Sequence, residues 1–153
     1  MGAEDNGLTL EGTSDENIAE ENKAVVRRLV EEVYNRDRMD LLDELVAQDV
    51  VNHTAVPEHR HGIEGFRHVI EWARANLDIV MVIEDAIAEG DKVALRIRAE
   101  GTHRGAVFGT EPTGKGFSVE HVHWHRLAEG KLVERWAVRD DLGTLRQLGV
   151  MPS

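Results

Sequence analysis

The sequence predicts an α+β fold in which helices come first and a curved antiparallel sheet follows. Up to residue 77, apolar residues recur every three or four positions, which is the period of an amphipathic helix. From residue 79 they recur at every second position, as in strands. Two similar turns, "AEGDK" and "AEGK", each join neighbouring strands closely enough for an antiparallel hairpin. Helices that are segregated from such a sheet indicate α+β rather than α/β.

Composition predicts one domain behind an acidic leader. Residues 1–16 are acidic, Gly-rich and aperiodic, so we expect a disordered tail there and a single α+β domain over residues 17–153. Seven acidic residues precede Lys23, the first basic one, so most of the net charge of −11 belongs to residues 1–22. The acidic balance argues against a nucleic-acid partner. No apolar run approaches the ~20 residues of a membrane span. No secretory signal pattern is visible either. We therefore expect a cytoplasmic protein.

The elements follow in order from these periods. A first helix is expected over residues 17–35, preceded by a capping box at Thr13-x-x-Glu16, and a short second helix over 39–47. Residues 49–62 contain Pro57 and Gly62 and are predicted to be irregular. The third helix covers "IEGFRHVIEWARANL", residues 63–77. The strands are expected at 79–89, 93–105, 117–127 and 132–140, with a loop over 106–116.

Three histidines alternate in the strand "FSVEHVHWHRL" and therefore face the same side of the sheet. They are His121, His123 and His125, spaced roughly 7 Å apart along the strand. One interpretation is a metal site, with a third ligand from His103, His53 or Glu120. Another is solvated or structural histidines. The third is one wall of a polar substrate pocket, with His125, nearest the turn, exposed to solvent.

Several other polar residues have two interpretations each. Arg135 shares a strand face with Ala137 and is either a stabiliser of a developing oxyanion or an exposed arginine. Asp140 is either a catalytic carboxylate or the N-cap of the short helix that follows it. Asn52 is suited both to a pocket and to a turn. Trp72, on the third helix, is either a substrate contact or part of the core.

Four stretches resemble the SnoaL-like polyketide cyclases of the nuclear transport factor 2-like superfamily. They are "ENKAVVRRLVEEVYNRDRMDLLDELVAQDVVNH", "AEGDKVALRIRAEGTHRG", "GTEPTGKGFSVEHVHWHRLAEGKLVERW" and "DDLGTLRQLG". The resemblance implies a cone-shaped α+β fold and a homodimer formed through the sheets. It also implies a role in antibiotic biosynthesis, where the family's cyclases close a ring by aldol condensation without metal or cofactor. The family's acid/base aspartate on the last strand corresponds to Ala137 here, and some relatives are hydroxylases.

Together these observations predict a cofactor-free acid/base enzyme that acts on a polycyclic aromatic, polyketide-like small molecule. The alternatives are a cofactor-independent hydroxylase of the same substrates and a non-catalytic binding module. The predicted catalytic residues are His123, Arg135 and Asp140. The predicted substrate contacts are Asn52, His53, Trp72, His103 and His121. We expect no metal ligands.

Overall fold

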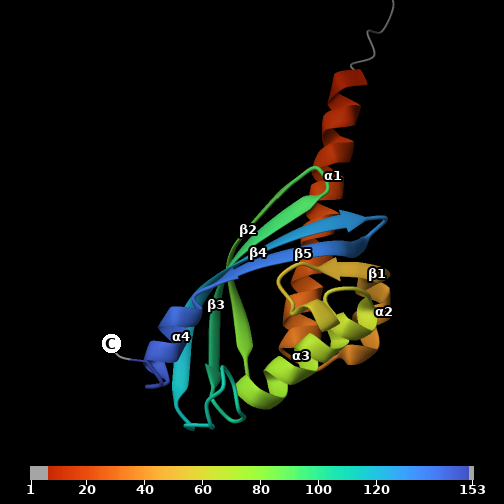
Figure 1. Cartoon of the computed structure of the whole chain (residues 1–153). Helices are drawn as coiled ribbons and strands as arrows, with labels where there is room; N and C mark the ends of the chain where they lie inside the picture. The colour runs from red at the N-terminus through yellow and green to blue at the C-terminus, as the bar shows by residue number, and fades with distance from the viewer. Residues whose placement is uncertain (1–6, 152–153) are drawn as a thin grey trace, which may run out of the picture.

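A five-stranded sheet with helices packed on one face forms the body of the protein (Figure 1). The computed structural model describes residues 7–151, with side chains from residue 14 onward. The elements are α1 (Gly7–Arg28), η1 (Leu29–Tyr34), η2 (Met39–Leu41), α2 (Leu42–Leu45), β1 (Val46–Asn52), η3 (Pro57–His59), α3 (Ile63–Leu77), β2 (Val80–Glu89), β3 (Lys92–Thr102), β4 (Gly116–Ala128), β5 (Lys131–Arg139) and α4 (Asp141–Gln147). The α+β prediction is confirmed. None of the helices in the described part combines the length and the apolar character that a membrane span requires.

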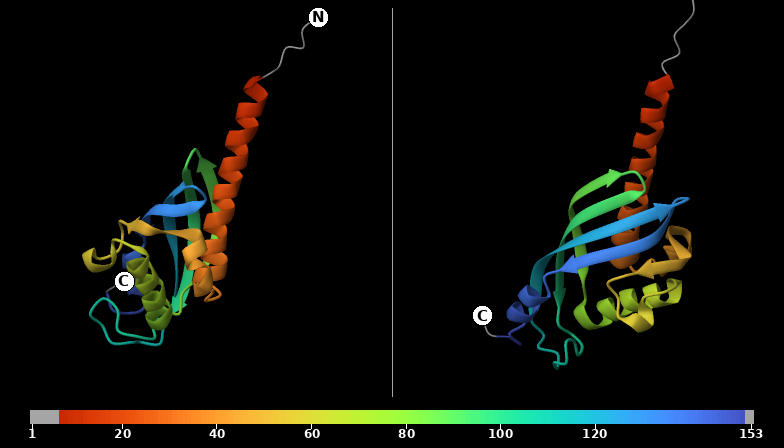
Figure 2. Two further views of the ribbon diagram at one scale, coloured as in Figure 1. Left: turned by 90° about the vertical axis from the view of Figure 1, so that its right-hand side faces the viewer. Right: turned by 45° about the horizontal axis from the view of Figure 1, so that its top comes forward.

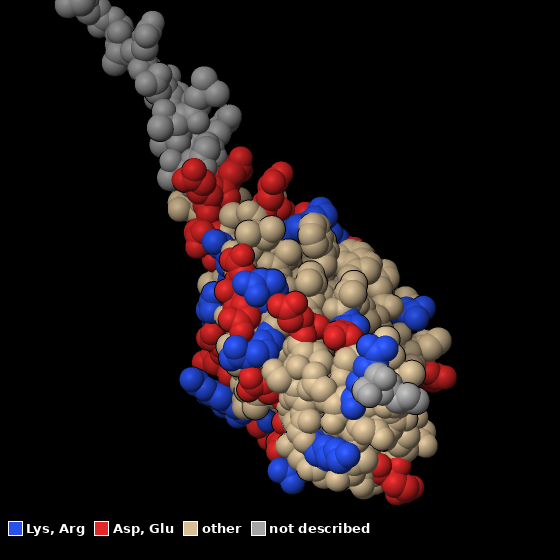
Figure 3. Space-filling model, turned by 90° about the vertical axis from the view of Figure 1, so that its left-hand side faces the viewer, with Lys and Arg blue, Asp and Glu red and all other residues tan. Residues whose placement is uncertain are grey.

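The main core lies between the first helix and the sheet. Val26, Leu29 and Val33 of α1 and η1 are at most 1% exposed and belong to one cluster with Leu95 and Ile97 of β3. The opposite side of α1 carries ion pairs such as Lys23–Glu20 and Arg27–Glu31, and charged residues gather along this helix in Figure 3. The start of α1 runs past the sheet and projects from the body (Figure 2).

The first helix begins at Gly7 and not near Asn17, so the predicted tail is helical from residue 7. Residues 1–6 of that tail lie outside the described residues. The glutamates that suggested a solvated leader are compatible with a helix, since glutamate has a high helix propensity. The sequence between Gly7 and Asn17 also contains no proline to prevent a helix.

Residues 46–52 form strand β1, where the sequence indicated the end of a helix and irregular chain. The strand pairs in parallel with β5 at the edge of the sheet, in the order β1-β5-β4-β3-β2, so the sheet is mixed. Its register shifts between Val46 and Val51, and its buried positions do not alternate regularly. Because the period of two is broken, the pattern that identified the other strands is missing here.

We predict that Gly101→Ala destabilises the fold by about 1–3 kcal/mol, the usual cost of overpacking. A Cβ at Gly101 would lie 2.7 Å from the Phe117 ring and against the carbonyl oxygen of Leu77. Gly116→Ala is the matched control, because its Cβ would meet only the Gly101 carbonyl oxygen at 3.5 Å. Denaturant unfolding of both variants measures the difference, and equal stability would contradict the packing described.

Candidate functional site

The three histidines of β4 are all buried on the helix-covered face of the sheet. His121 is 6% exposed, and His123 and His125 are each 1% exposed. The exposure expected for His125 is therefore wrong. In the antiparallel register with β5, His121 lies opposite Arg139, His123 opposite Ala137 and His125 opposite Arg135. Because Ala137 is small, the longer side chain of Arg135 can reach the space beside His123.

A bulge in β5 sets the direction of Arg135. The register with β4 shifts between Arg126 and Leu127, which pair with Glu134 and Leu132. Leu132 and Arg135 are consequently both buried although they are three residues apart. An extra residue in one strand reverses which side chains face inward beyond it, and such bulges often aim a side chain at a site. Here the bulge turns Arg135 toward the histidines.

The guanidinium of Arg135 is buried among neutral groups. Its Nη1 donates to Asn52 Oδ1 at 3.2 Å. Its Nη2 lies 3.4 Å from Nδ1 and 3.3 Å from Nε2 of His123, so this contact is not aligned with the lone pair of either ring nitrogen. The Nε atom is buried and has no hydrogen-bond partner. The structure thus brings together Arg135, Asn52 and His123, three of the residues that were predicted for the site.

Burial and the nearby arginine keep the histidines neutral at pH 7. Burial, with the charges of Arg139 and Arg135, lowers the pKa of His121 to about 4. Burial and Arg135 lower the pKa of His125 to about 3, and burial holds the pKa of His123 well below its usual value. His123 Nε2 lies 3.4 Å from His121 Nδ1, which gives the two rings a path for a proton.

Tyr34, the only tyrosine of the chain, is a member of this group that sequence reasoning missed. It ends the six-residue π-helical segment η1 and is 7% exposed. Burial raises the pKa of its hydroxyl, and the charge of Arg135 opposes that rise. Arg74 of α3 donates to the Tyr34 carbonyl oxygen at 2.6 Å and so holds the end of the segment. The π-helical turn has no clear sequence signature, although such turns are frequent at functional sites.

Three predicted contacts do not join the group. His53 lies on the other face of the sheet, where it stacks on Trp136 at 4.6 Å and contacts Glu134 Oε2 at 2.8 Å. Trp72 is 41% exposed and lies on the solvent side of α3 rather than in the core. His103 is fully buried at the start of the β3–β4 loop, where its Nδ1 accepts from the Thr113 amide at 3.2 Å.

Asp140 caps the last helix, which confirms the capping alternative. Its Oδ1 accepts from the Gly143 amide at 2.8 Å, at the start of α4. The carboxylate acts on the histidines only through its charge, which opposes the lowering of the His121 pKa.

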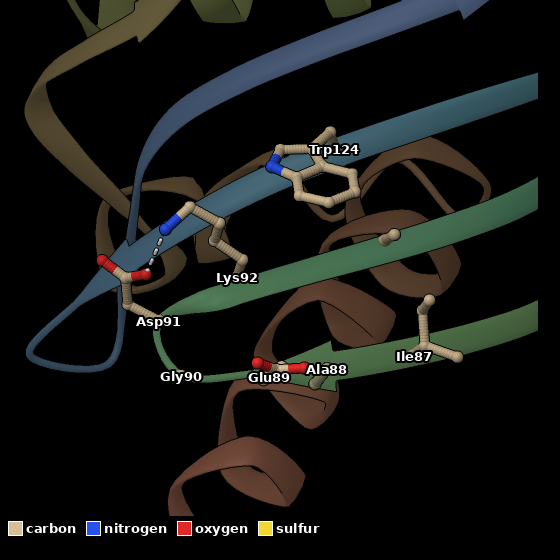
Figure 4. Close-up of a pocket in the computed structure, with 8 residues that line it drawn as sticks. Ile87, Ala88, Glu89, Gly90, Asp91, Lys92 and Trp124 are labelled. Atoms are coloured by element: carbon tan, nitrogen blue, oxygen red, sulfur yellow. Dashed lines mark hydrogen bonds and ion pairs between the residues drawn. The ribbon is translucent and has the colours of Figure 1, made fainter.

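The arrangement is suited to proton transfer and to holding an oxyanion. It contains neutral imidazoles, a buried guanidinium and an amide that orients it. Within the part of the chain that the structure describes, no three His, Cys, Asp or Glu side chains are grouped to hold a metal ion. In the described part of the chain, two hollows lie away from this group. One, of about 450 Å³, lies at the β2–β3 hairpin (Figure 4), and the other, of about 400 Å³, lies between α1 and β2.

Residues 24–148 match the family model of the SnoaL-like polyketide cyclases. The chain therefore belongs to this family, which confirms the resemblance read from the sequence.

The relatives include named cyclases and one candidate hydroxylase. Nogalonic acid methyl ester cyclase of Streptomyces nogalater is 33% identical over 119 residues, which cover 76% of this chain and 89% of that protein. The candidate polyketide cyclase IdmH of Streptomyces antibioticus has a similar structure, with a TM-score of 0.73 and 31% identity over 84% of this chain and 98% of that one. The candidate hydroxylase AclR of Streptomyces galilaeus matches with a TM-score of 0.74 and 28% identity over 88% and 85%.

We predict that the protein loses stability as the pH falls below neutral. A histidine whose pKa is 6.5 when unfolded and about 4 when folded binds its proton more readily in the unfolded state. Its contribution is complete above pH 6.5 and is lost toward pH 4. For His121 the loss between pH 7 and pH 5 is about 2 kcal/mol.

Denaturant unfolding at pH 7, 6 and 5 measures this loss. His121→Gln should reduce the pH dependence by about 2 kcal/mol, since it removes one buried titrating group. His61→Gln, at an exposed histidine, is the control and should leave the dependence unchanged. An identical pH dependence in wild type and His121→Gln would show that His121 is not held neutral by the fold.

Proposed function

We propose that this protein is a cofactor-free acid/base enzyme that cyclises a polycyclic, polyketide-like carbonyl compound. The observation that carries the proposal is the contact between buried Arg135 and His123 on the inner face of the sheet. Support comes from the relatives, among them a nogalonic acid methyl ester cyclase and an aklanonic acid methyl ester cyclase. These names identify the compounds to test first.

In the proposed reaction His123 takes a proton from a carbon next to a carbonyl group of the substrate. The carbonyl oxygen becomes an enolate oxygen, which the guanidinium of Arg135 stabilises. The enolate carbon then forms a bond to a ketone carbon of the same molecule, and the new alkoxide takes the proton back from the imidazolium. His121, which is nearer to solvent than His123, contacts His123 and orients the substrate oxygens.

One of the two effects that make His123 a weak base in the free protein also supports catalysis. Burial and, after it, the charge of Arg135 lower the pKa of His123 while no anion is present. An enolate next to Arg135 would cancel that charge and raise the basicity of the imidazole at the moment it receives the proton. Hydrogen bonds from Arg135 to the reacting oxygen strengthen as negative charge develops on it, so they are stronger in the transition state than in the enzyme–substrate complex, as catalysis requires.

We predict that His123→Ala lowers kcat by about 10²–10⁴-fold, the usual contribution of a general acid/base. Ring closure of nogalonic or aklanonic acid methyl ester, followed by chromatography, measures the rate. His61→Ala, which removes a histidine outside the site, is the control and should leave kcat unchanged. Wild-type turnover by His123→Ala would rule out the assigned role.

Hydroxylation of the same class of substrate is the second candidate function. Ala137 cannot transfer a proton, and the candidate hydroxylase AclR is among the structural relatives. The two reactions differ in their products, because hydroxylation adds one oxygen atom and consumes O₂ whereas cyclisation does neither. Mass spectrometry of the product together with an oxygen electrode separates them.

We further propose that the protein is a homodimer formed through the outer face of the sheet. One row of cross-strand partners on this face is apolar: Ile87, Ala94, Trp124 and Trp136. Ile87 is 65% exposed and Trp124 is 44% exposed, and Figure 4 shows both on the side away from α1. In the next row, Val122 is paired with Val138, which is 75% exposed. A patch of this kind on a monomer indicates an interface.

The charges around this row favour a second copy of the chain. Arg96 pairs with Glu120 at 3.7 Å, Arg98 with Glu84 at 2.8 Å and Arg126 with Glu134 at 2.6 Å. The face is therefore nearly neutral although the chain carries a net charge of −11. A locally neutral face does not repel its own copy, as a two-fold interface requires.

We predict that Val138→Glu converts the dimer into a monomer, because it places a charge within the apolar interface. Val56→Glu is the matched control, since Val56 is an exposed valine outside the sheet. Light scattering after size exclusion gives the masses. A monomeric wild type, or a Val138→Glu variant that remains a dimer, would contradict this interface.

A further inference from the structure

The buried positive charge of Arg135 has no negative partner among the side chains that the structure describes. Its guanidinium contacts the Asn52 amide oxygen and the His123 ring, and both groups are neutral. Other arginines of β3 to β5 behave differently: Arg98, Arg126 and Arg139 each lie beside a carboxylate. Arg135 is also the most buried of these four, at 7% exposure.

A buried ion without a counter-ion is unfavourable, since it has lost water and gained no opposite charge. Several of the N–H groups of Arg135 remain available, including the one on its buried, unpartnered Nε. The planar fork of a guanidinium matches a planar group with two oxygens that share one negative charge. The missing partner of Arg135 is therefore expected to be a planar anion with two oxygen atoms.

We propose that the ligand of this site carries a planar, delocalised oxyanion that pairs with Arg135 in the bound ground state. A free carboxylate and an ionised 1,3-dicarbonyl group both have this chemistry. The inference rests on the proposed function and deepens it, since it assigns to the substrate a charged group where the names of the cyclase relatives specify a methyl ester. Asn52 serves as the positioning residue that fixes the guanidinium.

The position of Ala137 provides an internal test of this pairing. Ala137 lies two residues from Arg135 on the same strand face and opposite His123. An aspartate placed there would supply the counter-ion from within the chain. Ala137→Asp should then compete with an added anion, whereas Arg135→Gln removes the charge that attracts it.

Binding is measured by calorimetry and thermal shift at pH 7.5 and constant ionic strength, without any turnover. The probes are benzoate for the carboxylate, dimedone for the ionised 1,3-dicarbonyl group, and methyl benzoate as the neutral ester. We expect benzoate, dimedone or both to bind and stabilise the wild type, and methyl benzoate to bind at least tenfold more weakly. Arg135→Gln and Ala137→Asp should each weaken anion binding at least tenfold.

The matched control is Arg38→Gln, which removes an exposed arginine that pairs with Asp40 outside the sheet and should leave the affinity unchanged. The inference is overturned if neither anion binds, if methyl benzoate binds as tightly as benzoate, or if Arg135→Gln binds the anions like the wild type. Circular dichroism shows whether each variant is folded. Because no reaction is required, anion binding without ring closure would contradict the cyclase proposal alone.

Discussion

The burial of one guanidinium on the inner face of the sheet is the constraint on which the site depends. Arg135 reaches that face because a bulge in β5 shifts the register between Arg126 and Leu127. It remains there because Asn52, at the end of the parallel strand β1, accepts its hydrogen bond. Ala137 leaves room beside His123 for the guanidinium. The bulge in β5, the edge strand β1 and the small residue Ala137 together position a single charged group, the guanidinium of Arg135.

The fold uses desolvation to set the protonation of the site. His121, His123 and His125 would be partly charged near neutral pH in water, and burial removes that charge. Helix α1, which packs on this face of the sheet, and the π-helical turn at Tyr34 therefore influence the protonation of the histidines as well as the stability of the fold. Because the arginine keeps its charge while the histidines lose theirs, the site has one cation and several neutral groups that can accept a proton.

The sequence predicted the elements whose period was regular and missed those whose period was interrupted. Helix α3 agrees with the prediction at both ends, since its apolar residues repeat without a break from Ile63 to Leu77. Strand β1 was missed because its register shift breaks the alternation. Strand parity placed Arg135 on the same face as Ala137, but the bulge that turns both toward His123 has no signature in the sequence. The placement of His53 on the opposite face depends on β1, which the sequence did not reveal. The position of Tyr34 depends on tertiary packing that no local pattern encodes.

The middle of strand β4, from His121 to His125, is reversed relative to an ordinary strand at the surface of a sheet. Such strands place apolar residues inward and polar residues toward water. In β4 the histidines face inward, whereas Val122 and Trp124 face outward and are 46% and 44% exposed. A strand of this kind is stable only if its buried polar side chains have polar partners and its outward apolar side chains are covered. The reversal therefore links the two proposals: the inner face binds a charged ligand, and the outer face binds a second copy of the chain.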